Sequence, residues 1–252
     1  MGAVIFCSMW EIAEYAIDRV IADEPDWACF EASHTILPRR VRITVATAAS
    51  SAESILREAK ILESLRHPGV PRVYDCGYFD DNLPWVATEL VTGPSVDGSL
   101  SIRALAEMLR DVGSILAFAH ARGVIHGDIS LDSIVLGETV RLVEWRRARS
   151  GTPLEAADDI YALGLAAYAV MPAKPPHRLA TLIAEMLERE PSARPTASEV
   201  TELATRVLDE PIDDDVEEVV LELDQPREPM WIATEPGVSR ERESSDSSGS
   251  PS

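Results

Sequence analysis

Positive charge is scarce in this chain of 252 residues. Lysine and arginine together number 23 against 43 acidic residues, the formal net charge is −20, and Lys60 and Lys174 are the two lysines. Nucleic acids and anionic lipid surfaces attract proteins through clustered positive charge. We therefore expect neither a nucleic-acid partner nor a membrane partner.

Long apolar runs and paired cysteines are also missing. No stretch approaches the roughly 18 apolar residues of a membrane-spanning helix. Cys7, Cys29 and Cys76 are odd in number and too far apart for a disulfide framework or a zinc site. Residues 1–14 begin with an apolar run but lack a basic leader, so we interpret them as an N-terminal extension rather than a secretory signal. These absences predict a cytoplasmic protein.

Acidic charge concentrates at the C-terminal end. Residues 209–252 contain 14 acids and 3 arginines, a net charge of −11, and are rich in serine, proline and glutamate. Such a composition cannot bury enough apolar surface to offset chain entropy, so we predict a disordered acidic tail. Its residues 213–224 mix acids with aliphatic side chains, which fits a strand added to a partner's sheet, a segment in the protein's own cleft, or a solvated spacer.

Two stretches of different pattern precede the tail. Residues 15–91 carry short β-branched runs around one helical pattern, in which Ser50 and Glu53 have the spacing of a capping box. Residues 98–208 are dominated by apolar residues at helical spacing, with later helices expected from about Asp159, Arg178 and Ala197. The pattern predicts an α+β protein.

Five segments carry ordered motifs. They are a regulatory-helix pattern at residues 57–68, a hinge pattern at 85–93, a catalytic-loop pattern at 123–136, an anchoring-helix pattern at 159–164 and a closing element at 186–196. Together they resemble the protein kinase-like superfamily, in the branch of the bacterial Ser/Thr protein kinases.

The resemblance implies a bilobal fold over residues 15–208. The N-lobe, residues 15–91, would hold a small antiparallel β-sheet and one helix, and residues 92–97 would form the hinge and linker. The C-lobe, residues 98–208, would be larger and mostly α-helical. Glu89 and Val91 occupy the hinge positions that border the nucleotide in the family.

The phosphate-binding loop of the family is not preserved. Ala22, Glu24 and Trp27 stand at its three glycine positions. Glycine lets backbone N–H groups approach the phosphates, whereas a carboxylate repels phosphate and an indole ring fills its place. We expect no phosphate cradle here.

The neighbouring strand has lost its phosphate-binding lysine. Thr44 replaces that lysine, which leaves Glu58, the regulatory-helix glutamate, without its usual partner. Arg42 replaces the small alanine that lies over the adenine ring in the family. Two positions for Arg42 are open, one folded back onto Glu58 and one facing solvent.

The catalytic loop keeps two of its residues. Asp128 stands at the position of the catalytic base and is a vestigial base under this interpretation, while His126 and Asp159 are expected to be structural anchors of the loop. Ser133 replaces the metal-binding asparagine, and a neutral hydroxyl is a poor magnesium ligand.

The metal-binding D-F-G motif is replaced by Glu144, Trp145 and Arg146. A glutamate can hold magnesium, but Arg146 and Arg147 offer it internal counter-charges instead. Only residues 145–158 separate Glu144 from Asp159, so the activation segment is truncated.

The truncated segment also lacks the family's A-P-E triplet. Residues 151–153 are expected to be a remnant of its substrate-docking stretch, and Glu155 the acid that remains to pair with Arg194.

These losses favour a pseudokinase, a regulatory or scaffolding module that binds a protein such as an active kinase or a phosphopeptide-binding domain. No cofactor is expected under this interpretation. The alternative is an atypical ATP-dependent Ser/Thr kinase or other phosphotransferase, with Asp128 as base, Glu144 as a lone magnesium ligand, and ATP and Mg as cofactors.

Overall fold

The computed structural model describes residues 11–79, 82–94 and 98–209, which fall within one compact unit. Apart from Asp209, the predicted acidic tail lies outside these residues, as do residues 1–10 of the predicted extension and 95–97 of the predicted linker. The first described residues, Glu11–Ile12, form a strand that pairs with the rest of the sheet.

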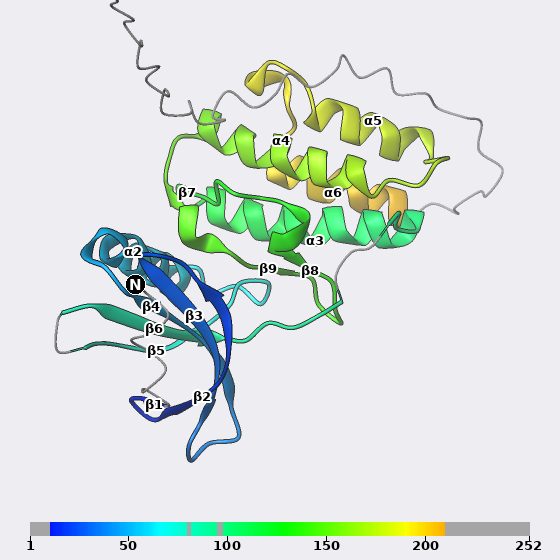
Figure 1. Cartoon of the computed structure of the whole chain (residues 1–252). Coiled ribbons are helices and arrows are strands. Elements are labelled where there is room, and N and C mark those ends of the chain that lie inside the picture. The colour runs from blue at the N-terminus through cyan, green and yellow to red at the C-terminus, as the bar shows by residue number, and fades with distance from the viewer. Residues whose placement is uncertain (1–10, 80–81, 95–97, 210–252) are drawn as a thin grey trace, which may run out of the picture. The chain divides into compact units, whose positions relative to one another are not determined.

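Six strands form one antiparallel sheet in the order β1-β2-β3-β4-β6-β5 (Figure 1). β3 and β4 lie in its interior and are buried along most of their length, as their runs of small and branched apolar residues predict. The strands are β1 (Glu11–Ile12), β2 (Tyr15–Asp23), β3 (Trp27–His34), β4 (Arg40–Ala46), β5 (Val73–Tyr78) and β6 (Pro84–Glu89).

The helix α2 (Ala49–Ser64) covers one face of this sheet. Its buried Ile55 packs with Ala46 and Val86, which come from β4 and β6. A separate cluster that includes Tyr15 and Phe30 gathers other side chains of the sheet. This position of α2 brings Glu58 to the edge of the cleft described below.

The second part of the molecule is mostly helical and contains the largest core. Leu109, Leu116 and Leu163 are fully buried there, and α3 packs against both α4 and α6. The α-helices are α3 (Ile102–His120), α4 (Pro153–Ala169), α5 (His177–Met186) and α6 (Ala197–Asp209).

Short elements connect these helices. The pair β8–β9 presents residues 142–145 to the sheet, and β7–β10 closes the catalytic-loop segment. The elements are β7 (Val124–Ile125), β8 (Ile134–Val135), β9 (Arg141–Leu142) and β10 (Arg149–Ser150), with the 3₁₀ turns η1 (Leu131–Ser133), η2 (Trp145–Arg147) and η3 (Pro191–Ala193).

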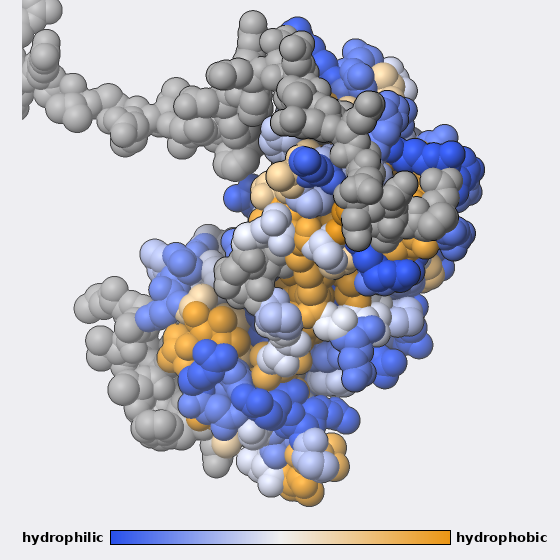
Figure 2. Space-filling model, turned by 90° about the vertical axis from the view of Figure 1, so that its right-hand side faces the viewer, coloured by the Kyte–Doolittle hydropathy of each residue, from blue (hydrophilic) through white to orange (hydrophobic). Residues whose placement is uncertain are grey.

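The α+β prediction is confirmed, with a sheet and one helix followed by a mostly helical part. Figure 2 shows hydrophilic side chains over much of one face, with apolar side chains gathered between them. In the part of the chain that the structure describes, no helix has the length and apolar character needed to cross a membrane.

Two helix starts differ from the predictions. α2 begins after Ala48 with no side-chain cap, and the Ser50 hydroxyl donates to Asp26 at 3.5 Å, so the predicted capping box with Glu53 is wrong. α4 begins at Pro153 rather than near Asp159, because Thr152 and Glu155 form a capping box.

The buried carboxylate of Asp159 joins α4 to the catalytic-loop segment. It accepts hydrogen bonds from the backbone N–H groups of His126 and Gly127, both at 2.8 Å, and lies 2.9 Å from Nε2 of His120. Its side chain is 1% exposed, so water cannot replace these contacts. The loop is therefore held by α4 and α3 together.

We predict that Asp159→Ala lowers the free energy of unfolding by about 3 kcal/mol or more, because two buried N–H groups lose their acceptor. Asp158→Ala is the matched control, since Asp158 is 67% exposed and pairs with Arg194 at 3.2 Å. Its cost should stay below about 1 kcal/mol. Urea denaturation of both variants measures the difference, and equal costs would contradict an anchoring role for Asp159.

Candidate functional site

A cleft of about 270 Å³ lies between the sheet and residues 143–145. Five of the predicted site residues line it: Thr44, Glu58, Glu89, Val91 and Glu144. Its volume lies just below the range of roughly 300–1,000 Å³ that is usual for small-molecule sites.

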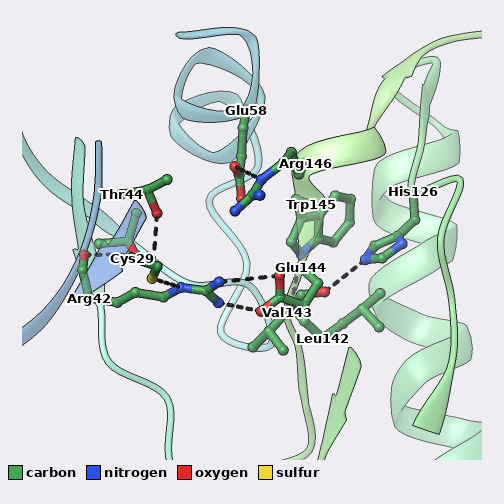
Figure 3. Close-up of polar contacts among 11 residues, drawn as sticks. Cys29, Arg42, Thr44, Glu58, His126, Leu142, Val143, Glu144, Trp145 and Arg146 are labelled. Atoms are coloured by element: carbon green, nitrogen blue, oxygen red, sulfur yellow. Dashed lines mark hydrogen bonds and ion pairs between the residues drawn. The ribbon is translucent and has the colours of Figure 1, made fainter. Parts of the chain in front are cut away.

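Arg42 reaches across this cleft from β4 and binds Glu144 (Figure 3). Nη1 and Nη2 of Arg42 donate to Oε1 and Oε2 of Glu144, the second bond measuring 3.2 Å. Both predicted positions of Arg42 are therefore wrong, because its partner is Glu144 rather than Glu58 or solvent. A two-point contact of this kind fits the planar shapes of the two groups.

The buried thiol of Cys29 helps to fix the side chain of Arg42. Nε of Arg42 donates to Sγ of Cys29 at 3.0 Å, and the Thr44 hydroxyl lies 3.9 Å from the same sulfur. Cys29 is fully buried on β3. Thr44 thus contributes to the surroundings of Arg42, in the place where the resemblance expects a lysine.

The charges of the pair stabilise each other. Burial acts to raise the pKa of Glu144, but the hydrogen bonds and the charge of Arg42 outweigh it and lower that pKa below its usual value. Burial also disfavours the charged form of Arg42, yet Cys29 and Glu144 together leave its pKa raised. Both groups are charged near neutral pH.

Glu144 has an unusual backbone conformation, with φ 63° and ψ 47°. This left-handed region costs a residue other than glycine about 1–3 kcal/mol. The contact with Arg42 helps to offset that cost and fixes the carboxylate toward the sheet.

Arg146 fills the space between α2 and β3. Its guanidinium lies 3.4 Å from the ring centroid of Trp27, and its Nε lies 3.9 Å from a carboxylate oxygen of Glu58, too far for a hydrogen bond. Burial raises the pKa of Glu58, against the opposing charges of Arg146 and Arg42. The Trp27 indole therefore stacks on the Arg146 guanidinium, at two positions where the resemblance expects glycine.

Trp145 and His126 form the buried support under this segment. The Trp145 Nε1–H donates to the Leu142 carbonyl at 2.7 Å, and its ring meets the His126 ring edge-on at 4.6 Å. His126 Nε2 lies 2.9 Å from the Val143 carbonyl oxygen. Burial lowers the pKa of His126, more than the nearby Asp159 charge raises it.

The remaining catalytic-loop positions are engaged locally. Asp128 lies 3.5 Å from Nε of Arg147, and its side chain is 52% exposed. The Ser133 hydroxyl is buried; it donates to the Ser130 carbonyl at 2.8 Å and accepts from the Ser130 N–H at 3.0 Å. Across residues 11–79, 82–94 and 98–209, no cluster of three or more His, Cys, Asp or Glu side chains could hold a metal ion.

The hairpin of β2 and β3 carries the three residues that stand at the family's glycine positions, where no phosphate cradle is expected. Ala22 pairs with Cys29 across it, and Glu24 lies exposed in the turn, where its N–H donates to the Trp27 carbonyl at 2.9 Å. The side chains of β2 that line the cleft are Arg19 and Ile21.

The hinge is tied to the helical part by a second two-point pair. Glu89 accepts from Nη1 and Nη2 of Arg141 at 2.8 and 2.7 Å. The hydrogen bonds from Arg141 lower the pKa of Glu89 despite its partial burial. Val91, two residues further on, lines the cleft.

The predicted pairing of Glu155 with Arg194 is wrong. Glu155 accepts a hydrogen bond from the Thr152 N–H at the start of α4 and lies 3.3 Å from Arg149. Arg194 instead donates to the Ala157 carbonyl at 2.9 Å and to Asp158 at 3.2 Å. Residues 151–153, expected to be a docking remnant, form the entry to α4.

Besides Arg42 with Glu144, sequence reasoning missed three further contacts: Glu89 with Arg141, Trp27 with Arg146, and His120 with Asp159. The first two join residues far apart in the chain, so no local pattern could reveal them. The sequence did hold a signal for the contact of Trp27 with Arg146. Both residues stand where the resemblance expects glycine, and an arginine side chain is attracted to the face of a tryptophan ring.

We predict that Glu144→Gln lowers the free energy of unfolding at pH 7 by about 1 kcal/mol, a discounted figure because Glu144 is 40% exposed. Since the pKa of Glu144 is lowered on folding, its contribution is present above the unfolded value near 4.5 and is lost as pH falls through the folded pKa.

Urea denaturation of the wild type and of Glu144→Gln between pH 7 and pH 3 measures this effect. The difference in the free energy of unfolding between the two proteins should become smaller below about pH 4.5. Glu63→Gln is the control, because Glu63 is 55% exposed and pairs with the exposed Arg66. A difference for Glu144→Gln that stays constant with pH would contradict the assigned ion pair.

Known proteins similar to this chain are Ser/Thr protein kinases. Serine/threonine-protein kinase PknA of Mycobacterium tuberculosis is 26% identical over 204 residues, covering 64% of this chain and 47% of PknA. PknB of Mycobacterium leprae is 26% identical over 157 residues, covering 48% of this chain and 25% of PknB. Serine/threonine-protein kinase pak-2 of Caenorhabditis elegans is 33% identical over 129 residues, covering 44% of this chain and 24% of pak-2.

The chain thus spans about half the length of PknA and about a quarter of the other two. No family model matches the sequence. The similarities nevertheless agree with a sheet lobe followed by a mostly helical lobe. The chain is a relative of the Ser/Thr protein kinases, with a bilobal protein kinase-like fold and a truncated activation segment.

Proposed function

We propose that this kinase-like domain is catalytically impaired and works as a regulatory or scaffolding module that binds another protein. The observation that carries the proposal is the Arg42–Glu144 pair, in which an arginine of the sheet engages both oxygens of the carboxylate at the metal position. The carboxylate therefore already has its counter-charge within the protein.

The donor set does not fit a magnesium nucleotide. Ser133 uses its hydroxyl within its own turn, Thr44 offers no charge to a phosphate, and Trp27 with Arg146 fills the glycine positions. A preorganised contact in phosphoryl transfer is worth about 10²-fold to 10³-fold in rate, and several are replaced together, although such effects are not additive. We therefore propose that neither ATP nor magnesium is a cofactor.

Protein binding is the role we propose, because the kinase-like fold is retained while residues that phosphoryl transfer requires are replaced. His126 and Asp159 keep the loop folded. The side chains at the positions that would contact a nucleotide contact other groups of the protein instead. The proposed partner is a protein, either an active kinase or a phosphopeptide-binding module, in the cytoplasm. A pull-down that compares the intact chain with a chain ending at Asp209 asks whether the acidic segment contributes.

The nucleotide prediction is tested by thermal denaturation with ATP and magnesium. A ligand at 100 times its dissociation constant stabilises a protein by about 2.7 kcal/mol, and we expect no shift for the wild type. The double variant Arg42→Ala/Thr44→Lys frees Glu144 and restores a lysine, and serves as the comparison. A clear shift of the wild type would overturn the proposal, whereas a shift of the double variant alone would show that Arg42 and the missing lysine together exclude nucleotide.

A second candidate, an atypical phosphotransferase, is favoured by one observation. Asp128 keeps an accessible carboxylate, 52% exposed and 3.5 Å from Arg147. This arrangement leaves the base position open to a substrate hydroxyl, with Glu144 as the lone metal ligand after release from Arg42.

Transfer of label from γ-labelled ATP to the chain itself or to a general protein substrate tests this candidate. It predicts transfer that falls by at least about 10²-fold in Asp128→Asn. Glu138→Gln is the control, because Glu138 is exposed between β8 and β9 and is not among the residues that line the cleft. Transfer that persists in Asp128→Asn would remove the assignment of Asp128 as the base.

A further inference from the structure

A second hollow of the molecule lies at the N-terminal end of α4, away from the cleft. Its volume is about 590 Å³, more than twice that of the cleft beside Arg42. Residues of α3, β7, α4 and α6 form its wall, together with the turn η3. This volume falls within the range of roughly 300–1,000 Å³ that is usual for small-molecule sites. We call this hollow the α4 cavity.

The wall of the α4 cavity is largely apolar and partly rigid. Ile125 from β7 and Ile160 from α4 give it branched aliphatic surface. Three prolines also line it, and proline fixes its own φ angle, so these parts of the wall are preformed. The prolines are Pro153, Pro191 and Pro195. A ligand that binds here meets a surface that needs little ordering.

Acidic side chains are missing from this wall. Among the described residues that line the α4 cavity there is no aspartate or glutamate, although 43 of the 252 residues of the chain are acidic. The cleft beside Arg42, by contrast, is lined by four acids. The α4 cavity therefore offers no carboxylate to a cationic ligand.

The two basic side chains in the wall already have partners. Arg194 donates to Asp158 at 3.2 Å, and its guanidinium lies 4.7 Å from the ring centroid of Tyr161. Nε2 of His120 lies 2.9 Å from the buried carboxylate of Asp159. Because both groups are paired within the protein, neither requires the charge of an anionic ligand.

The two threonine hydroxyls of the wall are engaged as well. Thr152 shares a capping box with Glu155 at the start of α4. At the start of α6 the Thr196 hydroxyl donates to Glu199 at 2.8 Å and accepts from the Glu199 N–H at 3.3 Å. A polar ligand group buried without a hydrogen-bond partner costs free energy. The wall therefore favours a ligand with few polar atoms.

One acceptor remains at His120. When the Nε2–H of a neutral His120 donates to Asp159, Nδ1 keeps a free lone pair. In the part of the chain that the structure describes, Nδ1 of His120 has no hydrogen-bond partner. A ligand in the α4 cavity can thus donate one hydrogen bond to this side chain.

We propose that the α4 cavity binds an uncharged, mainly apolar aromatic molecule that carries one hydroxyl group. The apolar surfaces of the ligand and the wall leave water together, which drives binding. An aromatic ring suits the three prolines, since proline rings and aromatic rings pack on each other in the recognition of proline-rich segments. The hydroxyl group donates to His120.

A ligand in this place lies one side chain away from the catalytic-loop segment. His120 lines the α4 cavity and contacts Asp159, and Asp159 accepts from the backbone N–H groups of His126 and Gly127. Occupation of the cavity therefore adds packing to the anchor of the loop. Hydrogen exchange at these two N–H groups should become slower when the cavity is filled.

Isothermal titration calorimetry of the full chain with naphthol near neutral pH tests the proposal. The dissociation constant should be on the order of 10–100 µM for a ligand of this size. Naphthoate and naphthylmethylammonium have the same rings with a negative and a positive charge, and each should bind at least about tenfold more weakly. Failure of naphthol to bind, or tighter binding of either ion, would overturn the proposal.

A charge placed in the wall should abolish this preference. Leu154→Asp should weaken naphthol binding at least about tenfold. Leu154 is 60% exposed in the first turn of α4, where an acid suits the helix dipole, so the fold should persist. Leu165→Asp is the matched control, because Leu165 is 41% exposed on the same helix and is not among the residues that line the α4 cavity. Equal losses of affinity in both variants would contradict the assigned site.

Backbone amide chemical shifts locate the ligand. Naphthol should shift the signals of His120, Thr152 and Ser198, which line the α4 cavity, and leave those of Thr44 and Val91 in the cleft unchanged. Shifts confined to the cleft would overturn the proposal. Hydrogen exchange measured on the same samples tests the connection to the loop, and unchanged exchange at residues 126 and 127 would contradict that connection.

Discussion

The ion pair between Arg42 and Glu144 is the contact on which the rest of the cleft depends. It spans 102 positions in the sequence and joins the sheet to the segment that follows β9. Once the carboxylate is held by the sheet, Trp145 enters the core beneath it and Arg146 turns toward Trp27 and Glu58. The two lobes are thereby connected by charges that belong to the protein itself.

The substituted positions are therefore partners of one another rather than independent losses. Arg42 stands where the resemblance expects an alanine and binds Glu144, where it expects the D-F-G aspartate; Trp27 stacks on Arg146, and the resemblance expects glycine at both of these positions. Farther from the cleft, Asp159 and His126 hold the loop through contacts that need no ligand. This separation lets the fold persist while the site changes.

The fold was largely predictable because its signals are local. β-branched runs predicted β4 to β6, helical spacing predicted α2, α3, α5 and α6, and ordered motifs supplied the bilobal arrangement. The start of α4 was missed because its capping residues were given other roles, Thr152 as part of a docking remnant and Glu155 as the partner of Arg194.

The site was predictable in its members but not in its pairings. Sequence placed Glu58, Thr44, Glu89 and Glu144 at one cleft, yet the partner of Arg42 depends on how β4 faces a segment about 100 residues later. Which acid a long basic side chain pairs with depends on distances that are fixed only in the folded protein. The same limit hid the contact of Glu89 with Arg141.

The most direct measurement is a double-mutant cycle on Arg42→Gln and Glu144→Gln, evaluated by urea denaturation at pH 7. If the pair closes the cleft as described, the coupling free energy should be about 1 kcal/mol or more, beyond the few tenths expected for independent sites. Additive effects of the two substitutions would contradict the account.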